Sequence, residues 1–251
     1  MKKVKSILVS QPAPKNDNSP YFDLERKHKI KIDFRPFVQI EGSTPREVRH
    51  QKIDFGNYSA VILTSRNAVD HYFRLAEEMR FQVPIEMKYF CISEAVAYYL
   101  QNYIVYRKRK IYVGERTIDD LTKVIKRFKD EKFLLPSSDR LKPAIPEALN
   151  GLNIDWDRAI LFKTVMSDLS DLENVFYDIL VFFSPTGIES LYHNFPNFKQ
   201  NDTRIAVYGK VTREAAEKQG LRCDIVVPTP ENKSMTAALE SYIKEANKRV
   251  H

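Results

Sequence analysis

One short pattern occurs twice in this sequence, far apart along the chain. Residues 61–73 read VILTSRNAVDHYF, and residues 181–195 read VFFSPTGIESLYHNF. In each stretch an apolar run predicts a buried strand, a hydroxyl residue follows it, and apolar residues then recur at helical spacing. Short apolar runs alternate with helical patterns along nearly the whole chain. This alternation predicts an α/β fold with parallel sheets that helices cover on both faces.

The repeat continues beyond the first corner of each stretch. YFCISEAVAYYL follows the first and places Ser93 at the end of a strand, and RIAVYGKVTREAAEKQGL follows the second and places Gly209 there. The interval from Ser65 to Ser93 is close to the interval from Ser184 to Gly209. The sequence therefore predicts two similar parallel-sheet α/β domains.

Two extended segments lack a helix directly behind them, and these mark where the chain passes between the domains. They are FRPFVQI at about residues 34–40 and AILFKTV at about residues 159–165. We predict that they form a two-stranded β linker. Domain one is then discontinuous, comprising residues 1–36 and 166–251, and domain two comprises residues 37–165.

The charge of the chain restricts its partners. A formal net charge of +7 favours a polyanionic partner, such as nucleic acid, a membrane surface or a ligand with many carboxylates. The densest basic cluster, Arg107–Lys110, is interpreted as an edge strand whose charges prevent aggregation. No motif of a nucleic-acid-binding domain occurs, so we expect no nucleic-acid partner.

The sequence also limits the compartment and the metal chemistry. No apolar run approaches the roughly 20 residues that span a bilayer, and ILVS near the start is shorter than the roughly 7–15 residues of a signal-peptide core. We therefore expect a cytoplasmic protein without a membrane partner. Cys91 and Cys223 have no neighbours at metal-ligand spacing, so both are expected to be small core residues and no metal site is expected.

The candidate ligand-binding residues follow predicted strands, where helix amides and loop groups of a parallel sheet point outward. An alternative interpretation is that each hydroxyl only caps its helix. The candidates are Thr64, Ser65, Arg66, Ser93, Ser184, Thr186, Gly209, Lys210 and Thr212. Ser137, Ser138 and Asp139 also end a strand and either line a cleft or form a turn. His71 and His193 lie on the helices behind the two corners and are interpreted as packing or surface residues.

In their order along the chain, these motifs resemble the uroporphyrinogen-III synthase family. The resemblance covers the whole chain and rests on an ordered set of weak motifs. They are LTSRNAV, YFCISEAVAYYL, LLPSSD, LFKTV, FFSPTGIESL, IAVYGKVTREAAEKQGL and VVPTPENKSMTAAL.

The resemblance implies two α/β domains joined by a two-stranded ladder, with an open cleft, and the activity of a cyclising lyase. Its substrate is hydroxymethylbilane, a linear tetrapyrrole with eight carboxylates, which closes into a ring with loss of water and inversion of ring D. The family uses no cofactor and no metal. The expected protein is a monomer that receives its substrate from hydroxymethylbilane synthase.

Two positions depart from the family pattern. Val96 stands where family members often have threonine, and Phe162 stands where many have a tyrosine suggested as the proton donor for the departing hydroxyl. Tyr208, Tyr112 and Lys210 are candidates to replace that donor. The two departures also leave open an alternative function, a non-catalytic protein that binds a tetrapyrrole or another polyanion on the same scaffold.

Overall fold

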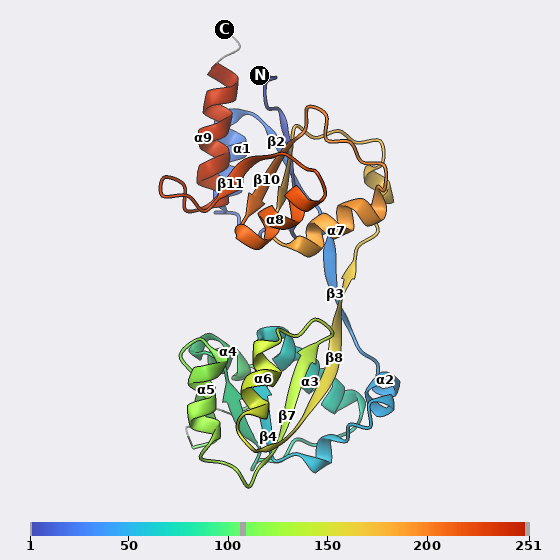
Figure 1. Cartoon of the computed structure of the whole chain (residues 1–251), viewed down its shortest axis with the longest axis vertical. Helices are drawn as coiled ribbons and strands as arrows, with labels where there is room; N and C mark the ends of the chain where they lie inside the picture. The colour runs from blue at the N-terminus through green and yellow to red at the C-terminus, as the bar shows by residue number, and fades with distance from the viewer. Residues whose placement is uncertain (1, 106–108, 249–251) are drawn as a thin grey trace. The chain divides into compact units, whose positions relative to one another are not determined.

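The computed structural model describes residues 2–105 and 109–248 (Figure 1). The chain divides into two compact units. Unit 1 comprises Met1–Gln39 and Val165–His251, and unit 2 comprises Ile40–Thr164. Each unit contains a sheet with helices on both faces, which confirms the predicted α/β class with parallel sheets.

Unit 1 is built on a five-stranded parallel sheet with the order β11-β10-β9-β1-β2. The side chains of α1 and α9 pack on one face of this sheet, and those of α7 and α8 pack on the other. Its elements are β1 (Ser6–Val9), α1 (Pro20–His28), β2 (Lys31–Phe34), η2 (Ser170–Leu172), β9 (Ile179–Phe182), α7 (Pro185–Asn194), β10 (Arg204–Tyr208), α8 (Lys210–Lys218), β11 (Cys223–Val227) and α9 (Met235–Lys248).

Unit 2 contains a sheet with the order β3-β8-β7-β4-β5-β6, in which β8 to β6 pair in parallel. Helices α2, α3 and α4 cover one face, and α5 and α6 cover the other. Its elements are β3 (Val38–Gly42), α2 (Pro45–His50), η1 (Phe55–Asn57), β4 (Ala60–Leu63), α3 (Arg66–Glu78), β5 (Lys88–Cys91), α4 (Glu94–Leu100), β6 (Ile111–Val113), α5 (Ile118–Ile125), β7 (Lys132–Ser138), α6 (Ala144–Asn150) and β8 (Asp155–Met166).

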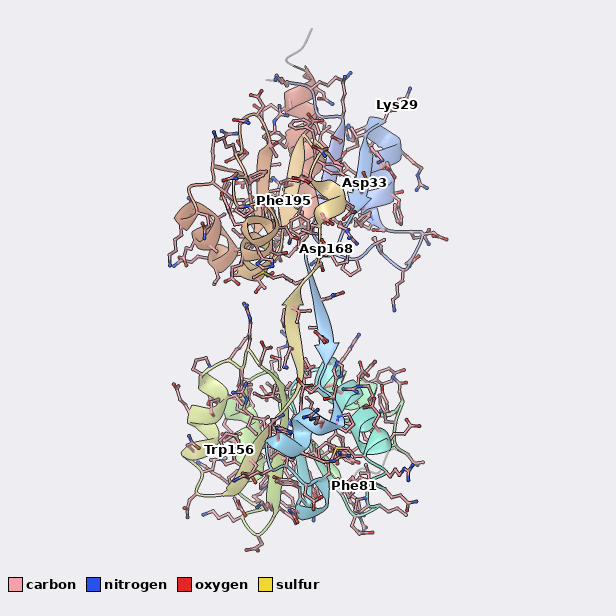
Figure 2. All side chains as sticks on the ribbon, turned by 90° about the vertical axis from the view of Figure 1, so that its right-hand side faces the viewer. Lys29, Asp33, Phe81, Trp156, Asp168 and Phe195 are labelled. Carbon is pink, nitrogen blue, oxygen red and sulfur yellow. The ribbon has the colours of Figure 1, made fainter. Side chains whose placement is uncertain are left out.

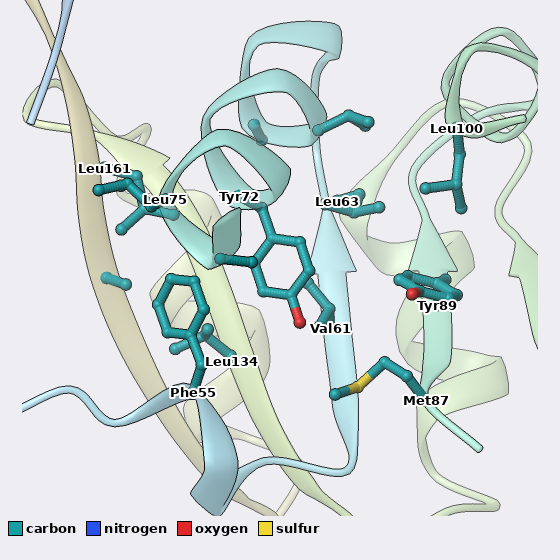
Figure 3. Packing of buried hydrophobic residues seen from close by; sticks show 14 of the residues in the cluster. Phe55, Val61, Leu63, Tyr72, Leu75, Met87, Tyr89, Leu100, Leu134 and Leu161 are labelled. Carbon is teal, nitrogen blue, oxygen red and sulfur yellow. The ribbon is translucent and has the colours of Figure 1, made fainter. Parts of the chain in front are cut away.

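Strands β4 and β9 lie inside their sheets and are apolar throughout because both of their faces are covered. All four residues of β4 are buried, and so are all four residues of β9. Figure 3 shows the packing of unit 2, where Tyr72 on α3 lies between Phe55 and Val61. The rings of Tyr72 and Phe55 stack with centroids 5.1 Å apart. Burial raises the pKa of Tyr72, so its phenol stays neutral.

The two sheets share one layout. In unit 2 the chain runs β4-α3-β5-α4-β6, and in unit 1 it runs β9-α7-β10-α8-β11, with consecutive strands adjacent in both. Beside these blocks lie two further strands, β7 and β8 in unit 2 and β1 and β2 in unit 1. The flanking pair therefore comes after the block in one unit and before it in the other.

The extended segments differ in detail from the sequence expectation. The first is interrupted, because β2 ends at Phe34 and β3 begins at Val38; Pro36, which lies between them, has no amide hydrogen to donate to a ladder. The second lies within the longer β8. In Figure 2, which shows all described side chains, Asp33 marks β2 and Trp156 marks β8.

The basic cluster Arg107–Lys110 is placed only in part. Arg107 and Lys108 lie outside the described residues. Arg109 and Lys110 lie in a turn directly before β6, the edge strand of the sheet, and not within a strand. Lys110 Nζ lies 2.7 Å from the carbonyl oxygen of Ile85 and also pairs with Glu86.

Candidate functional site

The first corner of unit 2 is formed by Thr64, Ser65 and Arg66, between β4 and α3. Ser65 is the N-cap of α3, and its Oγ accepts a 3.1 Å hydrogen bond from the amide of Ala68. Thr64 is half-buried and Arg66 is exposed. The guanidinium of Arg66 lies 5.4 Å from the ring centroid of Tyr99 on α4. Ser65 therefore caps the helix, and its oxygen keeps a second lone pair that can accept a hydrogen bond from a ligand. The position of Arg66 is stabilised by a cation–π contact.

The equivalent corner of unit 1 has the same capping geometry. Ser184 is the N-cap of α7, and its Oγ accepts a 3.2 Å hydrogen bond from the amide of Gly187. Thr186 lies half-buried in the first turn of α7. A side chain added at Gly187 would lie 3.7 Å from Ser184 Oγ and 3.8 Å from Ser10 Oγ. The two hydroxyls therefore face the same small space.

Ser10 is a candidate that the sequence interpretation missed. It directly follows β1, and its amide donates a 3.0 Å hydrogen bond to the carbonyl of Val181 on β9. Strands β1 and β9 are neighbours from which the chain continues in opposite directions across the sheet, and ligands of open α/β sheets bind at such switch points. The signal was present in the sequence, because ILVS is also an apolar run that ends in a hydroxyl residue.

The second corners, Ser93 and Gly209, resemble each other in a different way. Both are N-caps without a side-chain cap hydrogen bond, for α4 and α8 respectively. Gly209 has φ +84°, and a side chain added there would meet no atom within 4 Å. The backbone beside Gly209 is therefore open to close approach, in a conformation that favours glycine.

Behind Gly209, the first turn of α8 carries two further candidates. Thr212 is 3% exposed, and its hydroxyl has no hydrogen-bond partner among the residues that the structure describes. Lys210 is exposed, with Nζ 3.7 Å from Glu214. The oxygen of Thr212 is not fully buried, so a ligand at the first turn of α8 can form a hydrogen bond with it.

All these residues lie at the carboxyl ends of parallel strands, so within each unit they share one edge of the sheet. In unit 1 this edge brings together Ser10, Ser184, Gly209 and Thr212, and in unit 2 it brings together Thr64, Ser65 and Ser93. Amides at helix N-termini point outward there and attract anions.

The end of β7 carries a further group of polar residues, Ser137, Ser138 and Asp139. Their side chains already form hydrogen bonds with one another or with neighbouring residues. Ser138 Oγ donates to the carbonyl of Arg140 at 3.0 Å, and Asp139 Oδ1 accepts from the amide of Thr164 at 3.1 Å. Ser137 Oγ accepts from Arg158 at 2.9 Å. The turn interpretation therefore accounts for their polar atoms.

The two departures from the family pattern lie in the core of unit 2. Phe162 is 5% exposed, and Val96 is 6% exposed. Phe162 stacks on His71, while His193 is exposed on α7. Burial, with a smaller effect of Arg74, lowers the pKa of His71.

The three candidate proton donors are not equivalent. The hydroxyl of Tyr112 donates a 2.8 Å hydrogen bond to the carbonyl of Arg109, so it is already engaged. Tyr208 ends β10 at the carboxyl edge of unit 1, is 39% exposed and has no hydrogen-bond partner in the described part of the chain. Lys210 lies two residues further on and is exposed. Tyr208 and Lys210 are therefore the candidates that face solvent at this edge.

Over residues 2–105 and 109–248, no group of three or more His, Cys, Asp or Glu side chains could hold a metal ion. Within the same ranges, no helix has both the length and the apolar character needed to cross a membrane. Cys91 and Cys223 are free thiols, and burial raises the pKa of Cys91 to about 12. Cys91 is therefore a packing residue and not a reactive thiolate.

Fold and site together define a class: a parallel α/β protein of two units, each presenting helix amides and hydroxyls at one sheet edge. The family model described as uroporphyrinogen-III synthase HemD matches residues 23–237 of the chain. The chain therefore belongs to this family, and the resemblance read from the ordered motifs is confirmed.

Individual relatives agree with the family assignment. The chain is 26% identical over 141 residues to the uroporphyrinogen-III synthase of Saccharomyces cerevisiae, a match that spans about half the length of each protein (50% of both). Its structure is similar to uroporphyrinogen-III synthetase from Helicobacter pylori 26695, with a TM-score of 0.60, 16% identity, and 96% and 100% of the two chains covered. For a mutant uroporphyrinogen III synthase from Thermus thermophilus the TM-score is 0.56, with 13% identity and 98% and 100% covered. At these identities the structural likeness shows the fold.

Proposed function

We propose that this chain is a uroporphyrinogen-III synthase, a cyclising lyase of porphyrin and heme biosynthesis. It converts hydroxymethylbilane to uroporphyrinogen III with loss of water and inversion of ring D. The observation that carries the proposal is the family match over residues 23–237. This range includes all nine residues singled out as candidate binding residues, from Thr64 to Thr212.

The chemistry of the two sheet edges supports a polycarboxylate substrate. Each unit offers its own set of helix amides and hydroxyls for carboxylates of the tetrapyrrole, and the net charge of +7 favours its capture. The reaction needs the bilane held in the conformer in which the substituted carbon of ring D attacks first. Such catalysis by orientation and differential binding requires no strong nucleophile.

Departure of the hydroxyl as water requires a proton. Phe162 cannot supply it, and the hydroxyl of Tyr112 is engaged with the backbone. We assign the role to the edge of unit 1, where Tyr208 and Lys210 are both exposed. A positioned acid typically contributes roughly 10²–10⁴-fold to a rate. Tyr208→Phe and Lys210→Met, measured as kcat, separate the two groups, and the donor is the residue whose loss lowers kcat by at least tenfold.

The second candidate function is a protein that binds a tetrapyrrole or another polyanion without turnover. The observation that favours it is the apolar, buried character of Phe162 and Val96, which offer no hydrogen bond where family members often have hydroxyls. Such a protein would keep the binding edges and lack the proton donor.

We further propose that the chain acts as a cytoplasmic monomer with two domains, residues 1–36 with 166–251 and residues 37–165. Support comes from the pairing of β3 with β8, since the chain passes from one unit to the other at Gln39/Ile40 and at Thr164/Val165. We also propose that hydroxymethylbilane synthase hands over the substrate, because the substrate cyclises unaided to the wrong isomer. Light scattering coupled to size exclusion tests the monomer.

The deciding experiment supplies freshly generated hydroxymethylbilane to the purified protein, oxidises the products and separates the porphyrin isomers. Type III isomer formed faster than the bilane disappears in buffer supports the synthase. Heat-denatured protein is the control for spontaneous cyclisation. Type I isomer at the buffer rate, together with tight binding of uroporphyrinogen, would favour the non-catalytic binder instead.

A further inference from the structure

Two aromatic rings end adjacent strands at the carboxyl edge of unit 1. Phe183 follows β9 and Tyr208 ends β10, and their rings stack with centroids 5.9 Å apart and an interplanar angle of 28°. Phe183 also packs against the core that α1 and α9 share with the sheet. Tyr208 belongs to none of the core clusters of the described chain, and it is 39% exposed. Phe183 therefore packs against the ring of Tyr208, and Tyr208 remains partly accessible to a ligand.

The corner geometry does not require these aromatic residues. The shared layout of the two sheets makes Thr64 the counterpart of Phe183, and Ile92 the counterpart of Tyr208, each directly before its N-cap residue. Both counterparts are half-buried and neither is aromatic. The same strand–helix turn thus forms without a ring, so the aromatic pair is specific to unit 1.

The surroundings of Tyr208 suit a ligand with one flat apolar part and several anionic groups. The next residue, Gly209, leaves open space beside its backbone, and Val211 is 65% exposed. Lys210 supplies a cation, and the hydroxyl of Thr212 lacks a partner within the described chain. A partly exposed aromatic residue followed by residues that can bind anions is a common composition of a site for a ligand with a planar part and charged groups.

We propose that the ring of Tyr208, supported by Phe183, is the stacking surface for one pyrrole ring of the substrate. This inference rests on the proposed function and adds to it, because it gives unit 1 a ring contact at positions where the unit 2 counterparts, Thr64 and Ile92, carry no ring. Carboxylates of the same pyrrole then lie near Lys210 and the first amides of α8. The ring face of Tyr208, and not its hydroxyl, provides this contact.

The test compares Tyr208→Ala with Tyr208→Phe, which keeps the ring and removes the hydroxyl. The readouts are KM for hydroxymethylbilane and the dissociation constant of uroporphyrinogen III measured under anaerobic conditions. Loss of one stacked aromatic contact weakens binding by about tenfold to a hundredfold, by analogy with bases stacked on aromatic residues. We expect this change for Tyr208→Ala and wild-type binding for Tyr208→Phe.

Tyr98→Ala is the matched control, because Tyr98 is an exposed tyrosine (77%) on α4 of unit 2. Circular dichroism and thermal melting of all three variants check that they fold. Wild-type binding by Tyr208→Ala would overturn the proposal, and so would an equal loss in Tyr208→Phe, which would assign the effect to the hydroxyl. The binding assay does not depend on turnover, so a failure of the stacking surface is distinguishable from a protein that forms no type III isomer.

Discussion

The imidazole of His71 stacks on the ring of Phe162, with centroids 4.9 Å apart and an interplanar angle of 18°. His71 lies on α3 and Phe162 lies on β8, so the contact packs this helix against the strand next to the edge of the sheet. The ring that replaces the family tyrosine is therefore a packing partner of a neutral imidazole. Nδ1 of His71 in addition accepts a 3.3 Å hydrogen bond from Nε of Arg74.

This contact predicts how the stability of the protein depends on pH. Burial and Arg74 lower the pKa of His71 in the folded state below its unfolded value. The unfolded chain therefore binds the proton first as the pH falls below about 6.5. Stability from the neutral ring is complete above that pH and decreases as the pH falls towards the lower folded pKa.

The measurement is the free energy of unfolding in urea between pH 7.5 and pH 5. We expect the decrease to be smaller in His71→Phe, which keeps a stacking ring and removes the titration. His193→Gln, at an exposed position of α7, is the control and should follow the wild type. Identical pH dependence of wild type and His71→Phe would contradict the assignment.

Ser184 allows capping to be separated from binding. Its Oγ caps the amide of Gly187, so Ser184→Ala should cost about 1 kcal/mol of stability, whereas Ser184→Gly should cost only a few tenths. Both variants lose the hydroxyl. If this hydroxyl binds substrate, KM rises in both variants to a similar extent. An unchanged KM in Ser184→Gly would show that Ser184 acts only as the N-cap of α7.

Thr212 carries a hydroxyl whose removal should weaken binding and leave folding nearly unaffected. The hydroxyl has no hydrogen-bond partner within the described part of the chain and is not fully buried, so Thr212→Val should leave the free energy of unfolding nearly unchanged. The KM for hydroxymethylbilane should rise severalfold. Thr203→Val is the matched control, because its buried hydroxyl donates to the carbonyl of Tyr177 at 3.3 Å, and it should lose stability without a change in KM.

Gly209 and Gly220 form a matched pair of glycines with positive φ, at +84° and +77°. Each substitution by alanine strains the backbone and should cost about 1–3 kcal/mol. Gly209 lies at the candidate site, and Gly220 lies behind the other end of α8. In a steady-state assay at about 15 °C, where both variants should remain folded, we expect a reduced kcat/KM for Gly209→Ala and a wild-type kcat/KM for Gly220→Ala. Equal losses of activity in the two variants would instead indicate a general effect of destabilisation.

The sequence predicted most of what local interactions control. Apolar runs became β4 and β9, and Ser65 and Ser184 cap their helices with nearly equal geometry. Ser93 and Gly209 begin helices as predicted, although neither supplies a side-chain cap. These features depend on residues within one helical turn of each other, so spacing alone reveals them.

The neighbours of each strand were decided only by the tertiary structure. Nothing in the local patterns placed β1 beside β9, a pairing that brings Ser10 to Ser184, or stacked Phe183 on Tyr208. The patterns also did not show that Ser137 and Ser138 are engaged while Thr212 is unpaired in the described chain. Strand order and the satisfaction of polar atoms arise from packing between residues far apart in the chain, and no short stretch of sequence records that packing.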